Sequence, residues 1–105
     1  MEQPNLDYIN TLAGDDDDFK AILIKTIKAE LPQEIAAYTN SYTGGDYKTC
    51  AEHVHKLKHK ISILGLEKSY YLAAEFEDQL KNNENSLAPD FEAILQSMVT
   101  FTEGL

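Results

Sequence analysis

The chain has 105 residues, enough for one domain with a modest hydrophobic core. Hydrophobic residues make up 43% of it and recur with helical spacing, which argues against a disordered chain. The net charge of −9 argues against nucleic acid and anionic membrane surfaces as partners, because both are bound through clustered lysine and arginine.

The single cysteine and the N-terminal residues indicate the compartment. Cys50 lies on a predicted apolar seam, and a buried free thiol is typical of a reducing environment. Residues 1–4 lack the basic and apolar regions of a signal peptide, and no apolar run is long enough to cross a membrane. We therefore expect a cytoplasmic protein without membrane contact, and its acidic, polar surface favours a monomer.

The first two predicted helices are a short one and a long one. The short helix spans Asn5–Ala13 and ends at Gly14. The long helix opens with the acidic run 15–18, which suits a helix N-terminus, and continues to about Tyr42. Pro32 lies inside it and is expected to bend rather than end it, because the apolar spacing resumes in phase. Its apolar face consists of Phe19, Ile22, Leu23, Ile27, Leu31, Ile35 and Tyr38.

Three more helices follow the turn at Gly44 and Gly45. Asp46 is a suitable N-cap for the third helix, and Gly65 a suitable stop. The apolar seam of that helix consists of Cys50, Val54, Leu57, Ile61 and Leu64. The fourth helix is predicted over Glu67–Lys81, with Leu72, Ala73, Phe76 and Leu80 pointing inward. The fifth begins near Leu87 with Pro89 in its first turn and has an apolar face reaching Phe101.

These segments are joined by short connections, which place consecutive helices side by side. The predicted fold class is therefore all-α: an antiparallel up-down-up-down four-helix bundle with a short N-terminal capping helix. We expect one domain over residues 1–105.

The third helix carries the candidate chemistry. At about 100° per residue, His55 points roughly 140° away from the middle of the apolar seam. His59 and Ser62 share this outer face, and Lys58 lies at its border. An exposed neutral imidazole is a competent nucleophile. The lysines at 56, 58 and 60 form a cationic patch that favours an incoming anion, and we propose a phosphoryl group.

The residues His55-Lys56-Leu57-Lys58, followed by Leu64-Gly65-Leu66, resemble the signature of histidine-containing phosphotransfer (HPt) domains of bacterial phosphorelays. That signature is roughly His-x-Leu-Lys-Gly and two small residues, with Leu-Gly nine and ten positions after the histidine. Leu57, Lys58, Leu64 and Gly65 fall in place. The sequence departs from the pattern where His59 replaces the glycine and where Lys60 and Ile61 replace the small residues. The resemblance covers most of the chain in architecture but only about a dozen residues in sequence.

The resemblance implies that His55 accepts the phosphoryl group and that Lys58 helps to hold it. His59, Lys56 and Ser62 are further candidates for contact with the phosphate or a receiver domain. The implied function is a phosphorelay intermediate, which takes the group from an aspartyl-phosphate receiver domain and passes it to another. The implied partners are response-regulator receiver domains and a sensor or hybrid histidine kinase.

No cofactor is expected on this chain, since Mg²⁺ would belong to the partner receiver. The sequence has no glycine-rich phosphate loop, so we expect a phosphoryl carrier without kinase or ATP-binding activity. The imidazole at position 59 lies where a partner's active site would approach, and we hypothesise that it narrows the choice of partner.

Two other functions remain open. An acidic helical bundle can act as an adaptor module without phosphotransfer, in which case function would survive His55→Gln. His55 and His59 also have the i, i+4 spacing of helical zinc sites, but no glutamate follows His55 directly and the nearby lysines repel a cation. We therefore predict no metal site. The sequence leaves open which ring nitrogen would be phosphorylated and whether Tyr70 or Tyr71 stands near His55.

Overall fold

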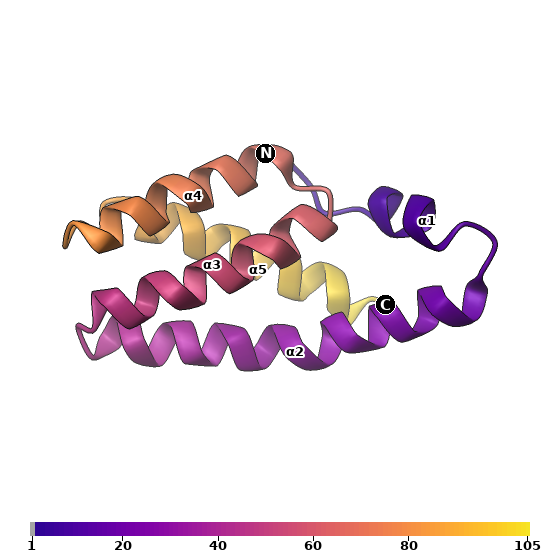
Figure 1. The fold of residues 1–105 in the computed structure, drawn as a ribbon, viewed down its shortest axis with the longest axis horizontal. Coiled ribbons are helices and arrows are strands. Elements are labelled where there is room, and N and C mark those ends of the chain that lie inside the picture. Colours follow the sequence, from indigo (N-terminus) through magenta and orange to yellow (C-terminus); the bar gives the residue numbers. More distant parts are fainter. Residues whose placement is uncertain (1) are drawn as a thin grey trace.

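A computed structural model describes residues 2–105 and shows five α-helices and no strand in that range. The helices are α1 (Asp7–Ala13), α2 (Asp17–Thr43), α3 (Tyr47–Ile63), α4 (Glu67–Lys81) and α5 (Ala88–Glu103). α3 packs against both α2 and α4, and α5 contacts α4 and α2, so the four longer helices enclose a common core (Figure 1). The predicted all-α fold class is confirmed.

Local sequence signals account for most of the helix ends. The Asp16 carboxylate accepts a hydrogen bond from Phe19 N at 2.9 Å at the start of α2, and Asp46 accepts one from Thr49 N at 3.2 Å at the start of α3. Pro32 lies within a continuous α2, as expected. The predicted bounds of α4 are confirmed at both ends.

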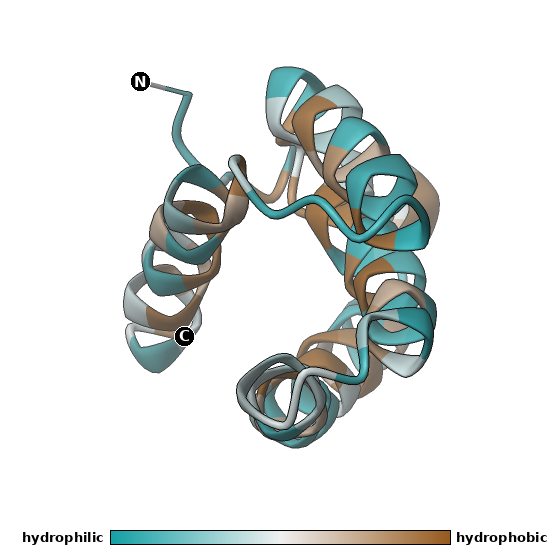
Figure 2. Cartoon of the chain, turned by 90° about the vertical axis from the view of Figure 1, so that its left-hand side faces the viewer, coloured by the Kyte–Doolittle hydropathy of each residue, from teal (hydrophilic) through white to brown (hydrophobic). Residues whose placement is uncertain are grey.

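The core forms on the seam that the spacing predicts for α3. Cys50, Val54, Leu57, Ile61 and Leu64 are all fully buried. Aromatic rings from three neighbouring helices pack against them: Tyr38 of α2 lies edge-to-face with Phe91 of α5 and with Phe76 of α4. The hydrophobic sides of the helices face one another across the bundle (Figure 2). The opposite side of α3 is thereby left to solvent.

The first turns of α2 differ from the prediction. Phe19 and Ile22 were expected on the buried apolar face, but they are 41% and 64% exposed. The reason is the length of α2, whose N-terminal end extends past α3 and has the short α1 beside it (Figure 1). Burial on α2 begins at Ile27 and continues through Leu31 and Tyr38. Leu72 of α4, also predicted to point inward, is half-buried.

The N-terminal segment forms hydrogen bonds with the turn between α3 and α4 and with the start of α4. Asn5 N donates a hydrogen bond to Leu64 O at 2.9 Å, and Gly65 adopts a positive φ of 78° beside the Asn5 side chain. The Glu2 carboxylate accepts the amides of Lys68 and Ser69, each at 3.0 Å, and so caps α4. Desolvation opposes ionisation of Glu2, but these hydrogen bonds outweigh it and lower its pKa.

None of the helices within residues 2–105 has the length and apolar character needed to span a membrane.

Candidate functional site

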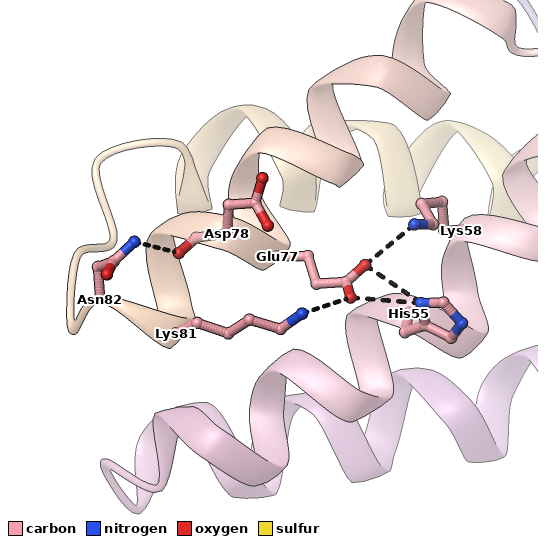
Figure 3. Close-up of polar contacts among 6 residues, drawn as sticks. All are labelled: His55, Lys58, Glu77, Asp78, Lys81 and Asn82. Atoms are coloured by element: carbon pink, nitrogen blue, oxygen red, sulfur yellow. Dashed lines mark hydrogen bonds and ion pairs between the residues drawn. The ribbon is translucent and has the colours of Figure 1, made fainter.

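His55 lies midway along α3 on the face opposite the core. Its side chain is 53% exposed, and its ring is tethered on one edge. Nδ1 lies 3.3 Å from both carboxylate oxygens of Glu77, which projects from α4 (Figure 3). An imidazole that is both exposed and held in one orientation is suited to react with a group delivered from solvent.

Glu77 is the centre of the polar network around this histidine. Its side chain is only 11% exposed, and Lys58 Nζ lies 3.1 Å from one oxygen while Lys81 Nζ lies 3.3 Å from the other (Figure 3). Burial alone would raise the pKa of Glu77, but the hydrogen bonds from Lys58 and Lys81 lower it overall. Glu77 is therefore an ionised carboxylate under ordinary conditions.

The charge of Glu77 decides the tautomer of His55. An ionised carboxylate only accepts hydrogen bonds, so the Nδ1 that faces it must carry the proton. In the neutral ring, Nε2 then has the free lone pair. Of the two ring nitrogens that the sequence left open, Nε2 is therefore the one that is available to accept a group from solvent.

The structure brings three of the predicted site residues together. Lys58 shares Glu77 with His55, and its ammonium lies 5.4 Å from the centre of the Tyr70 ring. The ring of His59 stands edge-to-face to that of His55, with 5.1 Å between centroids. Of the two tyrosines considered, Tyr70 is therefore the one linked to the site.

The other two predicted residues lie on either side of this group. Lys56 borders a surface hollow next to His55, together with Lys48 and Lys81. Ser62 lies nearer the α3–α4 turn and lines a separate hollow with Tyr8 and Tyr71.

Sequence reasoning missed Glu77 and Lys81. A signal for Glu77 was present, because it falls four residues after the buried Ala73 and three before the buried Leu80, and so lies on the inward side of α4. A glutamate in such a position is rarely buried unless it is paired. Lys81 follows at i+4, the spacing of a helical ion pair.

Metal binding gains no support from the arrangement. Within the described residues, no group of three or more His, Cys, Asp or Glu side chains is placed to hold an ion.

Lys60, the third lysine of the predicted cationic patch, points toward α2, where its ammonium lies 2.9 Å from Glu34 and 3.3 Å from Glu30. These two ion pairs link α3 to α2.

Comparison of the sequence with models of known protein families identifies the family to which the chain belongs. The model of the Hpt domain family matches residues 22–102, which include α3, α4, most of α2 and nearly all of α5. The chain therefore belongs to the Hpt domain family, whose members carry out histidine phosphotransfer in two-component phosphorelays with kinases and receiver domains. Searches of curated proteins and of solved structures give no match.

Proposed function

We propose that this protein is a phosphorelay intermediate that accepts a phosphoryl group on His55 from one receiver domain and passes it to another. It would act as a single domain, residues 1–105, in which the four longer helices run in alternating directions. The observation that carries the proposal is the tethered, half-exposed imidazole: Glu77 holds Nδ1, and Nε2 is left as the nucleophile.

The transfer step follows from this geometry. The Nε2 lone pair attacks the phosphorus of the receiver's aspartyl phosphate, a bond from Nε2 to phosphorus forms, and the bond from phosphorus to the aspartyl oxygen breaks. The aspartate leaves as a carboxylate, and the His55 ring gains a positive charge. Glu77, still bonded to the Nδ1 hydrogen, stabilises that charge as the carboxylate of a catalytic triad stabilises its imidazolium. The return step to a second receiver is the reverse.

Three lysines around His55 would attract the phosphoryl group. Lys58 and Lys81 are already held by Glu77, so their ammonium groups are positioned before the partner arrives. Lys56 borders the same hollow without belonging to the Glu77 network. In a chain of net charge −9, this local cationic group gives the acidic surface one place that attracts a phosphoryl anion.

The receiver would dock along the outer face of α3. Beyond His59, this face continues to the hollow lined by Ser62, Tyr8, Tyr70 and Tyr71. Tyr8 and Tyr71 are 51% and 61% exposed. Tyrosine supplies large contact area at interfaces with little loss of rotamer freedom. We call Tyr8, Tyr70 and Tyr71 the tyrosine surface and assign it to receiver docking.

The other members of the pathway follow from this function. The original source of the phosphoryl group would be a sensor or hybrid histidine kinase, and Mg²⁺ would be bound by the receiver. This chain would supply only the histidine, its carboxylate and its lysines. A cytoplasmic monomer is the form we propose for it.

The deciding experiment is transfer of radiolabel from a phosphorylated receiver domain, with His55→Gln as the control. We expect acid-labile, base-stable label on the wild type and none on His55→Gln. If no receiver in a broad panel transfers label to the folded protein, the proposal fails. The adaptor function would then be favoured, and it predicts that partner binding survives His55→Gln.

A further inference from the structure

His59 occupies the position at which the family pattern has glycine, and its ring lies directly beside that of His55. The two centroids are 5.1 Å apart and the ring planes are nearly perpendicular, at 89°. Both residues lie on the solvent-exposed side of α3. A side chain in this place is close to whatever becomes attached to His55.

The edge of His55 that receives the phosphoryl group is fixed by Glu77. Because the carboxylate occupies Nδ1, the new bond forms at Nε2, on the part of the ring that Glu77 does not cover. A phosphoryl group there extends three acceptor oxygens away from the ring. His59 is one helical turn further along and its ring centroid lies 5.1 Å from that of His55, so a rotation of its side chain can bring a ring nitrogen toward those oxygens.

His59 is chemically able to make this contact. An imidazole carries at least one N–H donor whether it is neutral or protonated. The side chain is exposed and takes no part in the ion pairs that Glu77 forms with Lys58 and Lys81, so its ring can turn toward a new partner. A glycine at this position would offer neither the donor nor the bulk that limits access of water.

We propose that His59 donates a hydrogen bond to the phosphoryl group on Nε2 of His55 and slows its loss to water. In hydrolysis, water attacks the phosphorus, the bond to Nε2 breaks and inorganic phosphate leaves, so the group moves away from the position that His59 contacts. The contact therefore stabilises the phosphorylated protein more than the transition state for hydrolysis. This inference rests on the proposed function and makes His59 a direct hydrogen-bond donor to the phosphoryl group.

The test uses phosphoramidate to phosphorylate the protein without any receiver. The Nε2 lone pair attacks phosphorus and ammonia leaves, so labelling is independent of a relay partner. The ³¹P resonance of phospho-His55 is assigned by its absence in His55→Gln, and its decay gives the half-life. In His59→Ala we expect a half-life about two- to tenfold shorter, the effect of one net hydrogen bond, together with a shifted ³¹P resonance.

Two further variants separate this contact from a structural effect. His59→Gln retains a hydrogen-bond donor, so the half-life of phospho-His55 should be close to that of the wild type. His53→Ala removes an imidazole elsewhere on α3 and should leave the half-life of phospho-His55 unchanged. An unchanged half-life and an unchanged resonance in His59→Ala would overturn the inference. Failure of the proposed function would be seen in a different experiment. In that case receiver domains would not transfer label to the wild type, and this result does not depend on the half-lives of the chemically phosphorylated variants.

Discussion

At the scale of single residues, Glu77 links the histidine to its cationic neighbours. It holds Nδ1 of His55 at 3.3 Å and is itself ionised because Lys58 and Lys81 bond to its two oxygens. One carboxylate thereby orients the ring, fixes its tautomer and holds two ammonium groups on the Nδ1 side of the ring.

Replacing Glu77 with glutamine tests this assignment. Glu77→Gln keeps the shape of the side chain but removes the charge that balances the imidazolium formed during transfer. Because a hydrogen bond to a charged group contributes about 1–1.5 kcal/mol more than a neutral one, we expect transfer from a phosphorylated receiver to slow about tenfold. Rapid-mixing measurements of transfer give the rate, and ¹⁵N NMR of the ring shows the tautomer. Wild-type transfer kinetics together with an unchanged tautomer in Glu77→Gln would show that Glu77 does not position His55.

The pH dependence of stability gives a second prediction for the same residue. The pKa of Glu77 lies below its ordinary value of 4.5 in the folded protein. A lowered folded-state pKa contributes stability that is present above the unfolded pKa and is lost as the pH falls through the folded one. At pH 7 we expect Glu77→Gln to lower the free energy of unfolding by about 1–3 kcal/mol, because Lys58 is left with a neutral partner.

The measurement is denaturant unfolding of both proteins between pH 7 and pH 3. The difference between wild type and Glu77→Gln should shrink below about pH 4.5, since glutamine does not titrate. Comparing the two proteins cancels the general effect of protonating other carboxylates in this acidic chain. A difference that stays constant down to pH 3 would contradict the lowered pKa.

At the scale of secondary structure, the turn between α3 and α4 determines how the two site helices meet. Gly65 has a φ of 78°, and an added Cβ would lie 2.6 Å from the Asn5 side-chain amide. The backbone angle favours glycine, and the Asn5 side chain would have to move away from an added Cβ.

We therefore expect Gly65→Ala to destabilise the fold by about 1–3 kcal/mol through backbone strain and crowding. The control is Gly104→Ala at the end of α5, where φ is −82° and the nearest atom to the new Cβ, Phe101 O, is 3.5 Å away. Thermal unfolding of the two variants should show a clear loss of Tm only for Gly65→Ala. Equal Tm values would mean that Asn5 and the backbone relax without cost.

The helices and their core were largely predictable, and the reason is periodicity. The seam from Cys50 to Leu64 is fully buried, and α4 has its predicted ends, because apolar spacing and capping residues act locally. The exposure of Ile22 was not predictable in this way, since it depends on how far α2 extends past its neighbours. The contact between Glu77 and His55 joins two helices across 22 positions of sequence, and spacing within one helix cannot show which residues meet across a bundle.

At the scale of the whole molecule, the tyrosine surface lies next to Ser62, beyond His59 along α3 and toward the α3–α4 turn. Tyr71 is 61% exposed, so removing its ring should cost little folding stability. If a receiver docks here, Tyr71→Ser should weaken its binding about tenfold or more, as for an aromatic residue central to an interface.

Isothermal titration with a receiver domain gives the affinity of each variant. Leu105→Ser is a suitable control because Leu105 is also an exposed apolar residue, at 40%, and borders the side of α2 around Lys25 and Ala29. The affinity of Leu105→Ser for the receiver domain should equal that of the wild type. Equal losses of receiver affinity in Tyr71→Ser and Leu105→Ser would indicate that general surface hydrophobicity, rather than the tyrosine surface, governs binding.

The cap that Glu2 places on α4 has a practical consequence for handling the protein. An affinity tag or fluorophore joined ahead of Glu2 would be attached next to a carboxylate that bonds to the backbone amides of Lys68 and Ser69 at the start of α4. Such a label, or its attachment to a sensor chip, would crowd the cap of the helix that carries Glu77 and Tyr71. A handle placed after Leu105, beyond the end of α5, leaves the Glu2 cap intact.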